Sequence, residues 1–193
     1  MNNILMATLF VAFIFFIHFL SKNTDYIIQD NSYNILKDIE SHILIDSAKI
    51  SLLSFRYVDN ARIVSFVYGG EFGMAVYIKG FNGKLKLDWI NYGDTKCFSR
   101  IITTDSGKYV VAAGDNENCF ISHIETEVNK KTIVMSTRGE RYFLKVWPLI
   151  GSEIIDGITF MRLYDENNLN ITEELMYDNR KTEKVIDDFV FIN

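Results

Sequence analysis

Cysteine and histidine are scarce in this chain of 193 residues, which narrows the chemistry that it can perform. The two cysteines, Cys97 and Cys119, form no C-x-x-C motif, so a zinc site of the usual kind is not expected. Outside the N-terminal hydrophobic segment, only His42 and His123 are available for acid–base work. His123 lies in an alternating stretch, where a surface or satisfied structural histidine is the expected role.

Catalytic and cofactor motifs are lacking as well. The sequence contains no G-x-S-x-G, H-E-x-x-H or P-loop pattern, and no pair of carboxylates is singled out by its spacing. The glycine-rich stretch 69–73 joins two expected strands, which predicts a turn or bulge. Residues 165–174 fail as a calcium loop, because a leucine occupies a position that needs an oxygen ligand. We therefore assign no catalytic, cofactor-binding or metal-binding residues, expect no cofactor, and favour a protein that is not an enzyme.

The chain also lacks a strongly basic region. Its longest basic runs are the pairs Lys130-Lys131 and Arg180-Lys181, and its formal net charge is −5. Nothing is present to neutralise a series of phosphates, so a nucleic-acid partner is not expected.

One long hydrophobic run is present at the N-terminus. Residues 4–20 carry no formal charge, and only Thr8 and His18 are polar. As a helix, the run would span about 26 Å, slightly less than the roughly 30 Å hydrocarbon core of a bilayer. As a helix, the run would carry bulky apolar side chains around its whole circumference, which argues against an amphipathic helix lying on the membrane surface. We predict a single-pass membrane anchor over residues 1–22; the alternative is a buried core helix.

The anchor has the features of an uncleaved signal anchor. No basic residue precedes it, and no small-residue cleavage site follows it. Two arguments disagree on which side of the membrane the following domain would lie. Lys22 and Lys37 follow the segment, which favours a cytoplasmic domain by the positive-inside rule. A leader of three residues usually stays inside while the following chain is exported, and on this ground we favour an exported domain.

The remaining chain divides into a short helical part and a β-rich part. Over residues 23–45, Ile28, Ile35, Ile39 and Ile43 recur near helical spacing, which predicts an amphipathic helical stalk capped by residue 30, 31 or 32. The apolar stripe favours core packing over a partner-helix site. Residues 46–193 are expected to form one β-rich domain.

The β pattern is clearest in two hairpins. Residues 84–89 alternate strictly, and Asn82-Gly83 separates them from another alternating run, which predicts a hairpin. A second hairpin is expected from Ile101 to Gly114. Short strands recur at intervals of about eight to twelve residues, which indicates a mainly β fold, an antiparallel sandwich or a curled sheet. Further expected elements are strands at 50–57, 62–68, 119–126, 131–137, 141–147, 153–164 and 185–192, and a short helix from Thr172.

A disulfide between Cys97 and Cys119 is the one covalent feature that the sequence suggests. It would close a loop of about 23 residues and contribute roughly 3 kcal/mol on the chain-entropy argument. In a simple meander the first and third strands lie about 9.6 Å apart, too far for a bridge. A bridge therefore requires the strands to lie in different sheets or the cysteines to lie on loops, and free thiols are the alternative.

Together these features predict a single-pass membrane protein of the cell envelope. Residues 4–20 would bind the membrane, and the exported β-rich domain would act as a binding or interaction module with a protein partner in the envelope. Two alternatives stay open. One is a cytoplasm-facing accessory subunit of a membrane complex, and the other is a membrane-tethered hydrolase.

Overall fold

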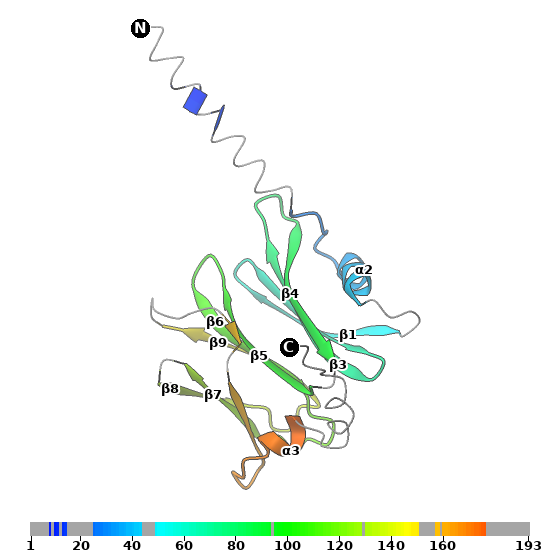
Figure 1. Cartoon of the computed structure of the whole chain (residues 1–193), viewed down its shortest axis with the longest axis vertical. Helices are drawn as coiled ribbons and strands as arrows, with labels where there is room; N and C mark the ends of the chain where they lie inside the picture. The colour runs from blue at the N-terminus through cyan, green and yellow to red at the C-terminus, as the bar shows by residue number, and fades with distance from the viewer. Residues whose placement is uncertain are drawn as a thin grey trace, which may run out of the picture.

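The computed structural model describes residues 25–43, 49–93, 95–128, 130–150, 157–158 and 160–176, together with residues 8, 10, 11, 13 and 14. In these residues the chain is mainly β, with three antiparallel sheets and two short helices, which confirms the predicted class at this level (Figure 1). Most of the predicted anchor and the whole of the predicted last strand, 185–192, lie outside the described residues. Among the residues described, no helix is long and apolar enough to cross a bilayer.

The strands form three sheets, named here A, B and C. Sheet A has the order β1-β2-β3-β4, formed by Ile50–Val58, Ala61–Tyr68, Glu71–Lys79 and Leu85–Gly93. Sheet B has the order β10-β5-β6-β9, formed by Gly157–Ile158, Cys97–Thr103, Lys108–Asp115 and Tyr142–Leu149. Sheet C has the order β11-β7-β8, formed by Met161–Tyr164, His123–Val128 and Lys131–Ser136.

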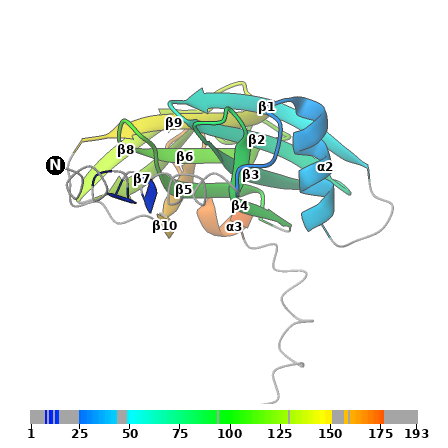
Figure 2. The ribbon, with the colours of Figure 1, turned by 90° about the horizontal axis from the view of Figure 1, so that it is seen from above.

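The sheets are stacked, and helix α2 (Ser32–His42) covers the outer face of sheet A (Figures 1 and 2). One core lies between α2 and sheet A, a second between sheets A and B, and a third between sheets B and C. Neighbouring residues on one strand belong to different cores: Val64 faces α2 and Ile63 faces sheet B. Sheets A and B are thus covered on both faces, which explains why β2, β3 and β6 read as continuous apolar runs.

Helix α2 confirms the predicted amphipathic helix over residues 32–42, but Ile28, expected on its apolar stripe, lies before the helix in a bridge to Leu85. Asn31 is its N-cap, because its side-chain oxygen accepts a hydrogen bond from the Asn34 amide at 2.9 Å. Ile35 and Ile39 are fully buried against sheet A, so the apolar stripe is core packing as predicted. On the same interface the buried Tyr77 hydroxyl donates to a carboxylate oxygen of Asp38 at 2.9 Å.

Both predicted hairpins are present. β3 and β4 pair on either side of Asn82-Gly83, and Gly83 has φ +76°, a left-handed conformation that glycine adopts without strain. β5 and β6 pair on either side of the turn at residues 104–107. In the glycine-rich stretch 69–73, Gly69 and Gly70 make the expected turn between β2 and β3, and residues 71–73 already belong to β3.

The expected strand at 119–126 begins later than predicted, at His123. The preceding segment is an irregular loop in which the buried Asn116 side chain donates to the Ile121 carbonyl and accepts from the Ile121 amide. Cys119 has φ +54°, which is incompatible with a strand. β7 then joins sheet C while β6 pairs with β9, so β5, β6 and β7 do not form a simple meander.

Candidate functional site

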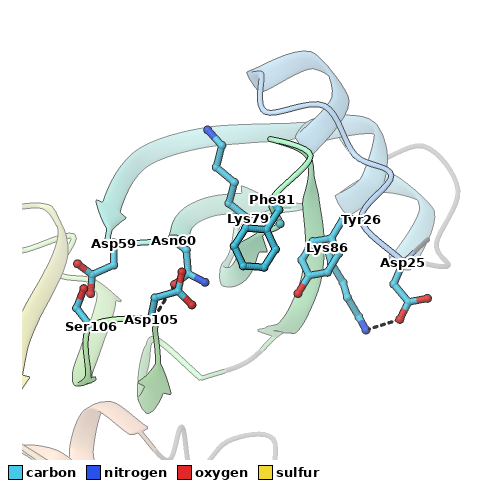
Figure 3. Close-up of a pocket in the computed structure, with 10 residues that line it drawn as sticks. Asp25, Tyr26, Asp59, Asn60, Lys79, Phe81, Lys86, Asp105 and Ser106 are labelled. Carbon is cyan, nitrogen blue, oxygen red and sulfur yellow. Dashed lines mark hydrogen bonds and ion pairs between the residues drawn. The ribbon is translucent and has the colours of Figure 1, made fainter. Parts of the chain in front are cut away.

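A hollow of about 760 Å³ with both polar and apolar lining surface lies at one end of the domain, where three hairpin turns converge (Figure 3). We call it the end pocket. Three of its side chains are acidic and two are basic. Its lining residues are Asp25, Tyr26, Asp59, Asn60, Lys79, Gly80, Phe81, Lys86, Asp105 and Ser106.

The β1–β2 turn and the β5–β6 turn are tied together in the wall of this pocket. The Asp59 carboxylate accepts hydrogen bonds from the Thr104 hydroxyl at 2.7 Å and the Tyr109 hydroxyl at 3.1 Å. The Asn60 side chain accepts from the Asp105 amide at 3.0 Å. The hydrogen bond from Thr104 lowers the pKa of Asp59, so this carboxylate is ionised at neutral pH and links sheets A and B.

The other wall is formed by the chain segment that follows the predicted anchor, Asp25–Asp30, which we call the linker. Ile28 forms an isolated antiparallel bridge with Leu85, with N···O distances of 3.1 Å and 2.7 Å. The Asn82 side chain donates to the Tyr26 carbonyl at 3.0 Å, and Lys86 pairs with Asp25 at 2.9 Å. The linker is therefore fixed along β4 and beside the β3–β4 turn.

A buried ion pair fixes the other end of the linker. Arg62 on β2 is only 5% exposed, and its guanidinium donates to one carboxylate oxygen of Asp30. Lys79 reaches the other oxygen at 3.0 Å. The aromatic rings of Phe55 and Tyr57 lie 4.6 Å and 5.0 Å from the guanidinium carbon. Cation–π contacts and a carboxylate thus compensate for the burial of this charge.

A second hollow, of about 460 Å³, lies where one edge strand of each sheet comes together. We call it the edge groove. β1, β9 and β8 each pair with a single neighbour in the described part of the chain. Its lining residues are Arg56, Tyr57, Val58, Val134, Met135, Ser136, Lys145, Val146 and Trp147.

The edge groove combines exposed apolar surface with positive charge. Tyr57 is 62% exposed, Val134 is 53% exposed and Trp147 is 48% exposed. Arg56 supplies a cationic side chain, and Lys145 supplies another that pairs with Glu140 at 2.5 Å. Trp147 also lines an adjoining cavity of about 220 Å³, so the apolar surface continues between sheets B and C.

Both cysteines are free in the structure, and they occupy contrasting environments. Cys97 is buried at the start of β5, and this burial raises the pKa of its thiol to about 12. Cys119 is exposed on the loop before β7. β5 and β7 do lie in different sheets, one of the two conditions for a bridge. A disulfide between these residues stays a prediction.

The two histidines have structural contacts. The His123 ring stacks on the Tyr164 ring, with a centroid distance of 4.9 Å and an angle of 1° between the planes. The Nδ1 atom of His42 lies 2.8 Å from the Asp38 carbonyl oxygen. Neither histidine lines the end pocket or the edge groove.

Within the described ranges, no three His, Cys, Asp or Glu side chains gather as a metal ion would require. The loop that begins at Asp165 is a turn, because the Asp165 carboxylate accepts from the Asn167 and Leu169 amides, both at 2.8 Å. No protein-family model, curated protein or solved structure gives a significant match to this chain.

Sequence patterns did not indicate either hollow, because each gathers residues from segments that are distant in the chain. Two local signals were present. Phe81 is an aromatic residue inside a turn, and Arg62 interrupts an apolar strand. Phe81 lies at an exposed turn, and Arg62 is a buried charge that requires an ionic partner.

We predict that Asp30→Asn lowers the free energy of unfolding by about 3 kcal/mol, because it leaves the buried Arg62 guanidinium without its counter-charge. The control is Asp25→Asn, which removes only an exposed pair and should change stability by less than about 1 kcal/mol. Denaturant unfolding of the full chain in detergent measures both changes. Equal effects of the two substitutions would contradict the ion pair.

The same pair predicts a pH dependence. Burial alone raises the pKa of Asp30, but hydrogen bonds from Lys79 and Arg62 outweigh this effect and hold the pKa below its usual value. The stabilisation is therefore complete above the unfolded-state pKa of about 3.9 and is lost as the pH falls through the lower folded-state pKa. Asp30→Asn should lose stability less steeply than the wild type in this acid range, and parallel curves would contradict the assignment.

Proposed function

We propose that this chain is a single-pass membrane-anchored protein whose exported β-rich domain binds a partner protein through the edge groove. The anchor rests on the uncharged apolar run 4–20. Phe10, Val11, Phe13 and Ile14, which belong to this run, are each more than half exposed, so the domain does not cover them. This exposure supports a membrane environment over the alternative of a buried core helix.

The observation that carries the binding function is the meeting of three edge strands in one groove that exposes both apolar and charged side chains. An edge strand presents backbone groups that a further strand can pair with, and natural proteins usually protect such edges. Here β9 carries the only proline of the sequence, Pro148, which limits pairing at its end, while alternate backbone groups of residues 142–147 face away from β6 and can pair with a further strand. Exposed Tyr57 and Trp147 are of the types that contribute most at protein interfaces.

The occupant that fits this groove is an extended segment of a partner protein with apolar and acidic side chains. An extended segment can add to a free strand edge through main-chain hydrogen bonds while its side chains occupy the pockets. Tyr57, Val134 and Trp147 would receive apolar side chains. Arg56 favours an acidic one by charge complementarity, whereas Lys145 already pairs with Glu140.

The hydrolase alternative would place its chemistry in the end pocket, where Asp25, Asp59 and Asp105 lie. Asp59 is poorly suited to be a general acid, because its hydrogen bonds lower its pKa and hold the carboxylate in the wall. The cytoplasmic accessory-subunit alternative uses the same edge groove and differs only in the side of the membrane.

Labelling of intact cells with a membrane-impermeant maleimide tests the exported orientation. We expect Cys119 to react in intact cells, because it is exposed, and Cys97 to react only after denaturation. Cys119→Ser should abolish the signal from intact cells. A reaction that requires prior reductant would support the predicted disulfide, whereas a reaction of Cys119 confined to lysed cells would favour the cytoplasmic alternative.

Selection from a library of decapeptides, with the full chain in lipid nanodiscs as bait, tests the edge groove. We expect the selected peptides to combine apolar and acidic residues and to bind the Trp147→Ala and Tyr57→Ala variants at least about tenfold more weakly. The matched control is Leu169→Ala, which truncates an exposed apolar side chain outside both hollows. Circular dichroism confirms that each variant is folded. Unchanged affinity in both groove variants would overturn the proposed site.

A further inference from the structure

The β3–β4 turn projects an aromatic side chain into solvent. Phe81 is 90% exposed, although it lies between two well-paired strands. Around it the sequence Lys79-Gly-Phe-Asn-Gly-Lys-Leu-Lys86 contains three lysines and no acidic residue, in a chain whose net charge is −5. Lys79 and Lys86 pair with Asp30 and Asp25, which leaves Lys84 as the lysine of this tip outside those two ion pairs.

This tip lies beside the chain that leaves the predicted anchor. The Tyr26 ring packs against Gly80 so closely that a Cβ atom added there would lie 2.7 Å from the ring. The Asn82 side chain holds the Tyr26 carbonyl from the other side of the turn. Figure 3 shows Tyr26 and Phe81 together at the end pocket, and Figure 1 shows the β3–β4 turn beside the start of the linker.

The short distance along the chain limits how far this tip can be from a membrane that holds residues 4–20. Four residues separate Leu20 from Asp25, and the five residue-to-residue steps between them span at most about 18 Å when fully extended. The contacts of the linker fix Asp25 and Tyr26 on the hairpin, so the hairpin cannot move away from the bilayer independently of the linker.

We propose that the β3–β4 tip, with Phe81 and Tyr26, rests in the headgroup region of the same bilayer that holds the anchor. The inference rests on the proposed anchor and deepens it. Aromatic rings favour the membrane interface, and Lys84, which lies outside the two ion pairs of the tip, is attracted to anionic headgroups. Because the anchor already holds the domain at the surface, even a weak contact is made at high effective concentration.

This contact would give the domain a defined orientation. Two attachments, the linker and the tip, prevent the domain from rotating freely about a single tether. The end pocket, which Phe81 also lines, would then face the headgroups. The edge groove is lined by residues of β1, β8 and β9 and not by the β3–β4 hairpin. It would therefore stay accessible to a protein partner.

Fluorescence quenching in vesicles tests the contact. In a Cys119→Ser background, the full chain with Phe81→Cys is labelled with an environment-sensitive fluorophore. It is then reconstituted into phosphatidylcholine vesicles that contain phosphatidylglycerol and nitroxide-labelled lipid. The matched control is Leu169→Cys, because Leu169 is 63% exposed and its loop, between β11 and α3 (Thr172–Met176), lies at the other end of the domain in Figure 1.

We expect blue-shifted emission and strong quenching of the probe at position 81, and neither change at position 169. Flotation of the vesicles shows separately whether the chain is anchored. A chain that floats with an unquenched probe at position 81 would overturn the tip contact and leave the anchor intact. Equal quenching at both positions would also overturn it, and a chain that does not float would remove the anchor and the inference together.

Discussion

The attachment of the linker to sheet A is the constraint on which the account depends. Asp30 neutralises the buried Arg62 at one end, and the pair of backbone hydrogen bonds between Ile28 and Leu85 holds the middle. These contacts hold the linker beside the first residue of β4, and the chain then enters α2. A segment that would otherwise be a flexible tether becomes part of the domain, and the position of the hairpin is set by the same contacts.

Burial on both faces of sheets A and B explains where surface remains for binding. Helix α2 and sheet C cover the outer faces of the stack formed by these two sheets, so the exposed backbone groups are at the strand edges. Figure 2 shows β1 and β9 along one side of the domain and β4 and β10 along the other. The linker occupies part of the second side, at Leu85. The edge groove on the first side is thus the region of the described domain where free edges and exposed aromatic side chains coincide.

Local features of the fold were predictable from the sequence. Alternation with an Asn-Gly turn predicted the β3–β4 hairpin, and helical spacing of isoleucines predicted α2 and its buried face. The division into three sheets was not predictable, because β6 pairs with β9 across an intervening hairpin and no local pattern records that choice. The start of β7 was misplaced, because the hydrogen bonds of the Asn116 side chain to Ile121 depend on tertiary packing.

The candidate sites were even less predictable. The end pocket requires the β1–β2 and β5–β6 turns to meet, which follows from the stacking of sheets A and B rather than from either turn. The edge groove requires residues near positions 57, 134 and 147 to converge. The anchor, in contrast to these two sites, is predicted from composition alone, because a membrane-spanning segment needs no tertiary contact.

Hydrogen exchange of the Ile28 and Leu85 amides, in the full chain reconstituted into lipid nanodiscs, tests the central claim most directly. Each amide donates to the carbonyl of the other residue, so the account predicts that both exchange slowly and lose their protection together in Asp30→Asn. The Asn82 amide, in the exposed turn, provides an internal reference for fast exchange. Exchange of both amides as fast as that of Asn82 in the wild type would show that the linker is a free tether and would contradict the account.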